Sequence, residues 1–245
     1  MNNIEQLKIL RRAYYGMVSY IDDKVGELID CLEKFHLKDD TAIIFTADHG
    51  DMVGERGFIE KRAFYEYSSR IPLICRFPHS WKENFEFNEP VSLIDIFPTL
   101  KDFVEARFPF SLDGHSFINS LHKYKTPNAE KYIISEYHCE GVKVPCFMIR
   151  KGVYKYIYVY NCDKAQLFNL KDDPDELVNL SGKSEYGQLE NDLKKKILDK
   201  FDCQKIEQEV RLKQKRCKYI HKAMMCGKKT VWDIKSSDEN YKYDQ

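Results

Sequence analysis

An aspartate and a histidine, Asp48 and His49, directly follow the apolar run at residues 41–47, and Lys61 comes thirteen residues after the aspartate. A carboxylate oxygen beside an imidazole is a ligand pair that suits a hard or borderline divalent cation. Gly50 lets the backbone leave the extended conformation, so both side chains can reach one ion. Taken by itself, such a pair is more often a turn-capping aspartate beside a hydrogen-bonded histidine.

The elements around this pair predict where it lies. Residues 41–47 are apolar almost throughout, which predicts a parallel strand covered on both faces. Ligands of open α/β sheets collect at the carboxyl ends of the strands, where Asp48 and His49 stand. Glycines let the following loop fold back and bring Lys61 into the same cleft, namely those at positions 50, 54 and 57.

A long amphipathic helix precedes the strand, because apolar residues recur every three or four positions from Ile4 to Phe35. A second strand is predicted at 71–77 and a helix at 91–104, in which Pro98 bends or interrupts the chain. A strand as apolar as 41–47 needs a neighbouring strand on each side. Only one candidate for a parallel neighbour, the strand at 71–77, follows it in the sequence. We therefore expect the chain to be the second half of a larger α/β sheet.

From residue 122 the pattern changes to short Tyr- and Ile-rich runs separated by turn signals, which predicts an antiparallel meander in a separate layer. A helix entered through "DDPDELVNL" follows, with one apolar face formed by Leu189, Leu193, Ile197 and Phe201. Residues 205–245 are predicted to form a basic helix and a polar tail. The fold class is thus α/β with a small antiparallel subdomain and a C-terminal helix, and the expected domain limits are 1–121, 122–202 and 203–245.

Composition excludes some classes of function. Lys+Arg and Asp+Glu both number 39 among the 245 residues, so no basic excess points to a nucleic acid. No stretch approaches the roughly 18 consecutive apolar residues of a membrane span, and the N-terminus is too polar for a secretory signal. The eight cysteines contain no C-x-x-C pair. We expect a soluble, cytoplasmic chain with reduced thiols and without a membrane partner.

The stretch "TAIIFTADHGDMVGERGFIEKRAFYEYSSRIPLICRFP" resembles the second signature of the sulfatases, in the alkaline-phosphatase superfamily. The resemblance includes the D-H-G-D, the G-E-R-G loop, a lysine twelve residues after the histidine, a Y-E pair and R-[IV]-P-L. It continues through "VSLIDIFPTL", "LDGHSF" and "LFNLKDDPDELVNL". The last segment, "KRCKYIHKAMMCGKKTVWDI", is similar to the tail of choline-sulfatase-like members.

The resemblance implies an alkaline-phosphatase-like fold and hydrolysis of a small sulfated substrate. Asp48 and His49 match two ligands of the family's divalent cation, usually Ca²⁺ and sometimes Mg²⁺ or Mn²⁺. Lys61 matches a catalytic lysine that reaches the sulfate and the leaving group. The tail implies a homo-oligomer contact, to which Trp232 would contribute an anchor. The charged residues of the loop, Asp51, Glu55 and Arg56, receive no catalytic role.

The sequence also departs from the family pattern. The family's nucleophile is a formylglycine made from the cysteine or serine of C/S-x-P/A-x-R, and this motif is absent. Cys146 and Arg150 have the right spacing, but Met148 stands where proline or alanine should be, so we interpret the match as coincidence. The family's other metal carboxylates and its upstream histidine and lysine are also missing. We therefore expect a sulfatase chain without its N-terminal half, inactive alone.

Two other hypotheses stay open at this point. The chain is a non-catalytic assembly partner of full-length relatives, or it hydrolyses phosphonate or phosphate esters on the same fold. His115 and His138 are interpreted as ordinary hydrogen-bonded histidines, and the Tyr-rich run 154–160 as core. The basic run 211–229 is interpreted as a solvated amphipathic helix.

Overall fold

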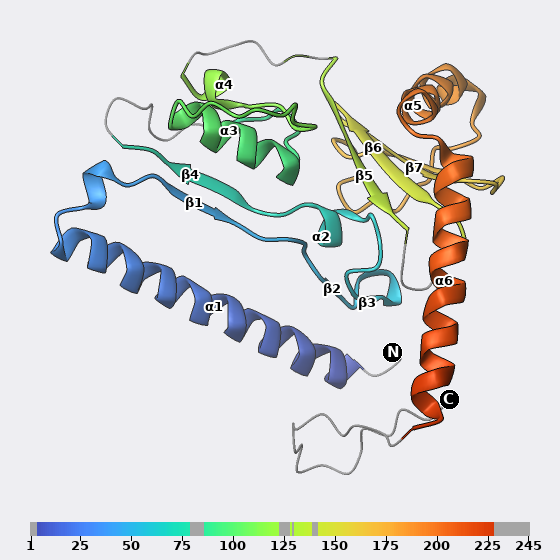
Figure 1. Cartoon of the computed structure of the whole chain (residues 1–245), viewed down its shortest axis with the longest axis horizontal. Helices are drawn as coiled ribbons and strands as arrows, with labels where there is room; N and C mark the ends of the chain where they lie inside the picture. The colour runs from blue at the N-terminus through green and yellow to red at the C-terminus, as the bar shows by residue number, and fades with distance from the viewer. Residues whose placement is uncertain (1–3, 79–85, 123–127, 129, 139–141, 228–245) are drawn as a thin grey trace.

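The computed structural model describes residues 4–78, 86–122, 128, 130–138 and 142–227 (Figure 1). Three antiparallel sheets occur in these residues: the pair β1–β4, the short hairpin β2–β3, and the sheet β5-β6-β7-β8. Figure 1 shows the β1–β4 ladder with α1 along one side and α3 along the other, while the four-stranded sheet lies beyond it. Trp232 and the rest of 228–245 lie outside the described residues.

The predicted N-terminal helix is confirmed as α1, Ile4–Lys34. It ends in a Schellman motif: His36 takes a left-handed φ of 55°, its N–H donates to the Glu33 carbonyl, and the Leu37 N–H donates to the Leu32 carbonyl. None of the residues of α1 is buried, and its apolar stripe stays largely exposed, with Leu28 at 67%. The amphipathic pattern therefore forms the helix, but the described residues leave most of its apolar face uncovered.

The predicted parallel pairing of the first strand is wrong. Strand β1, Ile43–Thr46, pairs antiparallel with β4, Leu73–Arg76, and its described residues have no other partner strand. A parallel neighbour requires a crossover that returns the chain to the starting end of the strand. The segment between β1 and β4 contains instead the short hairpin β2–β3 and the four-residue α2. It stays at the carboxyl end of β1, so β4 starts there and runs in the opposite direction. The side chains of β1 are accordingly half-buried.

Pro98 does not bend the helix predicted at 91–104. A 3₁₀ turn, η3 (Leu93–Asp95), leads into α3 (Ile96–Phe103), so Pro98 lies in the first turn, where backbone N–H groups have no partner within the helix. Asp95 is 5% exposed and accepts hydrogen bonds from the backbone N–H groups of Ser92 and His115. The short α4, Ile118–His122, follows.

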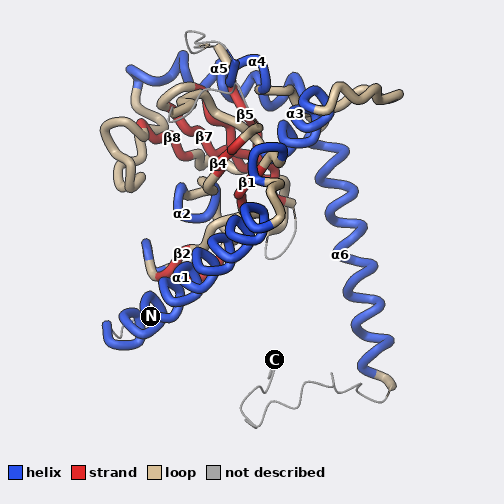
Figure 2. Tube along the Cα trace, turned by 90° about the vertical axis from the view of Figure 1, so that its left-hand side faces the viewer, coloured by secondary structure: helices blue, strands red, loops and turns tan. Residues whose placement is uncertain are grey.

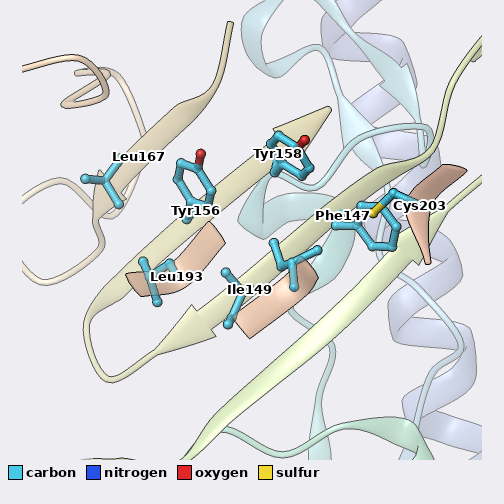
Figure 3. Close-up of a cluster of buried hydrophobic side chains, with 8 residues drawn as sticks. Phe147, Ile149, Tyr156, Tyr158, Leu167, Leu193 and Cys203 are labelled. Carbon is cyan, nitrogen blue, oxygen red and sulfur yellow. The ribbon is translucent and has the colours of Figure 1, made fainter. Parts of the chain in front are cut away.

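The predicted meander is confirmed as a four-stranded antiparallel sheet, with the strands β5 (Tyr132–Tyr137), β6 (Cys146–Lys151), β7 (Tyr154–Val159) and β8 (Gln166–Asn169). Helix α5, Gly187–Lys200, covers one face. The buried cluster on this face contains Phe147, Ile149, Tyr156, Tyr158, Leu167, Leu193, Ile197 and Cys203 (Figure 3). The apolar helix face that the sequence predicts therefore packs on the sheet.

Two details of this region differ from the prediction or extend it. The segment "DDPDELVNL" forms turns rather than the start of a helix, and α5 begins later, after the 3₁₀ turn η4 (Ser184–Tyr186). On the opposite face of the sheet, Met148, Ile157 and Phe168 pack against Phe64 and Tyr65. This second cluster joins the C-terminal sheet to the loop that follows β1.

The predicted basic helix is α6, Cys203–Met225, whose N-cap Asp202 accepts the Lys205 N–H. Figure 2 shows α6 projecting from the body of the molecule. Its last turns expose apolar side chains, including Tyr219 at 77% and Met224 at 65%. None of the helices in the described part of the chain has the length and apolar character that crossing a membrane requires.

Candidate metal centre at the end of strand β1

The loop after β1 folds back on itself as the glycine pattern predicts. Strand β2 (Met52–Val53) pairs antiparallel with β3 (Ile59–Glu60). Gly54 and Gly57 adopt φ values of 106° and 75°, which favour glycine, and the Gly54 N–H donates to the Phe58 carbonyl. The hairpin returns the chain to the end of β1, so Lys61 comes back beside His49.

The structure brings together the three residues that the sequence singles out. Lys61 Nζ lies 2.7 Å from His49 Nε2, and Asp48 Oδ2 lies 3.3 Å from the same nitrogen. The Asp48 side chain is 84% exposed and that of His49 is 31% exposed. The three groups therefore form a small polar surface that opens outward from the strand end.

Hydrogen bonds orient both ligand candidates. His49 Nδ1 lies 2.9 Å from the Gly50 carbonyl oxygen, which can only accept, so this nitrogen carries the proton in the neutral ring. His49 Nε2 then presents a lone pair to the ammonium of Lys61. Asp48 Oδ1 accepts the backbone N–H of His49, which leaves Oδ2 free to turn toward the imidazole.

This donor set fits a divalent cation. Oδ2 of Asp48 and Nε2 of His49 are close enough for one ion to lie about 2.4 Å from each. A metal-bound histidine commonly donates its other ring N–H to a carbonyl, as His49 does to Gly50. In this structure the Lys61 ammonium occupies the lone pair of Nε2, so it has to move away before an ion can bind there. Within the described ranges, no cluster of three or more His, Cys, Asp or Glu is placed to hold a metal, so this site offers two candidate donors.

The short helix α2, Glu66–Ser69, holds the two sides of the site together. The Gly50 N–H donates to the Ser68 carbonyl oxygen, and the Ser68 hydroxyl donates to the Lys61 carbonyl. A Cβ on Gly50 would lie 2.2 Å from the Tyr67 carbonyl oxygen, so only glycine allows this approach. The contact explains the glycine after His49 by packing rather than by a special backbone angle.

The charged residues of the loop have structural partners. Arg11 of α1 donates to the Val53 carbonyl and to Glu55, whose carboxylate also accepts the Val53 N–H. The Arg56 guanidinium lies 4.4 Å from the centroid of the Tyr65 ring. These contacts fix the G-E-R-G loop from both sides, and they involve residues to which the sequence analysis assigns no catalytic role.

Sequence reasoning missed a buried ionic cluster behind α2. Lys155 Nζ lies 2.6 Å from Glu66 Oε1 and 2.9 Å from Glu176 Oε1, and Arg150 contacts the second oxygen of Glu66 at 3.1 Å. Lys155 is 0% exposed and Glu176 is 1% exposed. Burial raises the pKa of Glu176 above its ordinary value, and the charge of Lys155 opposes that shift. The available signal was that Lys155 is the one charged residue in a strand of aromatic and branched apolar residues.

His115, His138 and the C-x-x-x-R match have their contacts outside this site. His138 Nε2 contacts Glu136 at 2.9 Å and its ring packs on Phe147, whereas the backbone N–H of His115 donates to Asp95. Cys146 begins β6 and is buried, and burial raises the pKa of its thiol, which disfavours the nucleophilic thiolate.

Comparison with known proteins identifies the family. The family described as "N-sulphoglucosamine sulphohydrolase, C-terminal" matches residues 54–203. The choline-sulfatase of Rhizobium meliloti is 34% identical over 248 residues, which cover 97% of this chain and 47% of that protein. A solved structure with its substrate D-glucosamine-2-N,6-O-disulfate is 30% identical with a TM-score of 0.65, covering 78% of this chain and 40% of that one.

Phosphonate monoester hydrolase of Agrobacterium radiobacter has the same fold, with 26% identity and a TM-score of 0.70 over 80% of this chain and 42% of that one. The chain thus spans less than half the length of these three relatives. Its mixed helix and sheet architecture, with the small antiparallel sheet and C-terminal helix, agrees with their alkaline-phosphatase-like fold. The chain belongs to the sulfatase family and matches the C-terminal part of its members.

Proposed function

We propose that this chain forms one wall of a metal-dependent sulfuric-ester hydrolase site. Asp48 and His49 are the proposed ligands of a divalent cation, with Ca²⁺, the usual ion of the family, as the first candidate and Mg²⁺ or Mn²⁺ as alternatives. Lys61 is the proposed catalytic cation. The observation that carries the proposal is the contact of 2.7 Å between Lys61 Nζ and His49 Nε2 at the end of a strand, in a chain of the sulfatase family.

Each residue has a distinct task in this proposal. A bound cation supplies positive charge that stabilises the sulfuryl oxygens as negative charge develops. His49 would offer its Nε2 lone pair to such an ion, because its Nδ1–H is held by the Gly50 carbonyl. Lys61 would have to move off Nε2 for an ion to bind there, and its ammonium would then be available to donate hydrogen bonds to the sulfuryl oxygens and the departing alkoxide.

The nucleophile has to come from outside these residues, because the chain lacks the C/S-x-P/A-x-R motif. We therefore propose that the chain alone does not turn over sulfate esters and acts after association with an N-terminal half. The apolar side chains that α1 leaves exposed support such an association; they include Ile4 (70%), Met17 (60%), Val18 (53%), Ile21 (47%) and Leu28 (67%). Apolar surface of this extent marks an interaction site.

Two observations favour second candidates. The likeness to phosphonate monoester hydrolase, with a TM-score of 0.70, favours phosphonate or phosphate ester hydrolysis on the same wall. The exposed apolar turns of α6 favour a homo-oligomer contact of the choline-sulfatase-like kind, which would also serve a non-catalytic assembly partner. Sulfate ester hydrolysis remains the first proposal, because the family match and the choline-sulfatase likeness agree on it.

A turnover experiment tests the reaction. The purified chain is assayed with p-nitrophenyl sulfate and with p-nitrophenyl phenylphosphonate, alone and mixed with the N-terminal half of the Rhizobium meliloti choline-sulfatase. We expect turnover of the sulfate only in the mixture, and its loss in Asp48→Asn. Asp51→Asn is the matched control, because Asp51 lies in the same loop and is not assigned to the metal. Turnover by the chain alone that requires Asp48, or an equal loss in both variants, would overturn the assignment.

Calcium binding tests Asp48 and His49 as metal ligands without measuring turnover. Two ligands bind a divalent ion weakly, so 1 mM Ca²⁺, on the order of a weak site's Kd, should raise the Tm of the chain alone by no more than about 1 °C. In the mixture with the N-terminal half, a completed site should give a clear rise that Asp48→Asn removes. A large rise with the chain alone, unaffected by Asp48→Asn, would place the ion elsewhere.

A further inference from the structure

Three charged side chains meet in the interior between the C-terminal sheet and helix α2. Lys155 of β7 contacts Glu66 of α2 at 2.6 Å and Glu176 of the turn after β8 at 2.9 Å. Lys155 is fully buried and Glu176 is 1% exposed. Desolvating such charges costs more than most ion pairs return, so the cluster contributes little net stability compared with an apolar core of the same volume. The cluster does supply directional hydrogen bonds, which fix the relative positions of the groups they join in a way that apolar contacts do not.

The cluster fixes the position of α2. Lys155 Nζ donates to the Phe64 carbonyl at 2.7 Å and to the Ser69 hydroxyl at 3.3 Å, on both sides of the helix. Glu176 Oε2 accepts the backbone N–H of Glu66 at 2.7 Å, at the first residue of α2. Three directional contacts from the C-terminal sheet therefore hold a helix of four residues, which is too short to be stable by itself.

Helix α2 passes this position on to the candidate metal centre. Its Ser68 is 3% exposed, accepts the Gly50 N–H through its carbonyl and donates its hydroxyl to the Lys61 carbonyl. Gly50 in turn accepts the Nδ1–H of His49. The hydrogen bonds of Glu176 and Lys155 to one side of α2, and those of Ser68 on the other, are thus linked through the helix backbone to both partners of the contact between His49 and Lys61.

We propose that Lys155 and Glu176 are positioning residues, which set the contact between His49 and Lys61 by holding α2 against it. The inference rests on the proposed function in one respect: the surface that they position is the proposed metal and substrate wall. Neither residue touches that wall, so both act through Ser68. Tyr67 and Asp175 add a second connection, since the tyrosine hydroxyl donates to the Asp175 carboxylate at 2.7 Å.

Hydrogen exchange of the Gly50 amide measures this coupling directly. In Glu176→Gln the amide should exchange about tenfold faster, because a neutral amide oxygen accepts the Glu66 N–H more weakly than a carboxylate does, by about that factor in an opening equilibrium. Amides of the paired residues Met148 and Ile157 should keep their protection. Asp95→Asn is the matched control: it also removes the charge of a buried carboxylate that accepts backbone N–H groups, but those groups belong to Ser92 and His115 and not to α2. It should leave Gly50 unchanged.

The ¹⁵N resonances of the His49 ring provide a second measurement, which should not change if Glu176 affects only the overall stability of the fold. The Nδ1-protonated tautomer should dominate in the wild-type chain, and Glu176→Gln and Ser68→Ala should both reduce its share. Glu176→Asp keeps the charge and serves if Glu176→Gln does not fold. Unchanged Gly50 exchange and His49 tautomer in the folded Glu176 variant would overturn the proposal, as would equal loss of protection at Gly50 and in β6–β7. Neither measurement uses metal or substrate, so each judges the positioning role separately from the proposed reaction.

Discussion

Replacing Lys155 by methionine should lower the free energy of unfolding by about 3–5 kcal/mol, because it removes one partner of a buried ionic cluster. The methionine fills a similar volume, so the cost comes from charge rather than from a cavity. Glu66 and Glu176 would keep their negative charges in the interior, with Arg150 alone to oppose them. Two hydrogen bonds from Lys155 Nζ, to the Phe64 carbonyl and to Ser69, are lost as well.

Lys151→Met provides the comparison that isolates burial. Lys151 pairs with Glu130 at 2.7 Å, nearly the distance between Lys155 and Glu66, but its side chain is 24% exposed and that of Glu130 is 76% exposed. Exposed pairs contribute at most about 1 kcal/mol, so this substitution should cost no more than that. The loss of unfolding free energy should therefore be several-fold larger for Lys155→Met than for Lys151→Met, because only the charge of Lys155 is fully buried.

Urea unfolding followed by circular dichroism gives both free energies, provided that the slope with denaturant is the same for each variant. The pH dependence supplies an additional sign test. Burial raises the pKa of Glu176, so its folded state binds a proton more readily than the unfolded state does. The penalty in Lys155→Met should thus be fully present above the raised pKa and should shrink as pH falls through it. A cost equal to that of Lys151→Met at neutral pH would refute the argument.

The other predictions concern one buried phenol and one close backbone approach. Burial raises the pKa of Tyr156 to about 12, so its contribution to stability is complete below about pH 10 and is lost as pH rises toward 12, by up to roughly 3 kcal/mol. Tyr156→Phe should remove that alkaline loss, which urea midpoints compared between pH 9 and about pH 11 will detect. Gly50→Ala should cost about 1–3 kcal/mol, since its Cβ would meet the Tyr67 carbonyl at 2.2 Å. Gly16→Ala in α1, where a Cβ meets nothing, should stabilise by about 0.5–1 kcal/mol in the same assay, and a matching loss in both would contradict the steric reason.

Local periodicity was sufficient for the elements that short-range contacts define. The recurrence of apolar residues over 4–35 predicts α1, and the alternating runs after residue 122 predict the antiparallel sheet. Strand direction was beyond this reasoning, because an apolar strand has the same composition whether its neighbour is parallel or antiparallel. The direction of β4 follows from the path of the loop before it, which stays at one end of β1.

The ionic cluster shows a second limit of sequence reasoning. Alternation in β7 places Lys155 on the face opposite Tyr154 and Tyr156, where a charged side chain normally meets solvent. Here that face is covered by a segment about ninety positions earlier in the chain, which includes Phe64 and Tyr65. Burial of Lys155 is therefore a consequence of tertiary packing, and within the strand only the apolar Ile157 and Val159 on the same face point to it.

The candidate centre combines a rigid inner side with an open outer side. Its loop is held by α1 through Arg11 and by α2 through Ser68, and α2 is held in turn by Glu176 of the turn after β8. These supports come from widely separated parts of the chain, so the loop keeps its position only when the whole described fold is formed. The Asp48 carboxylate is largely exposed, and the lone pair of His49 faces the ammonium of Lys61. Such an arrangement fixes two donors and one cation in advance and leaves their common side accessible to a further charged or apolar surface.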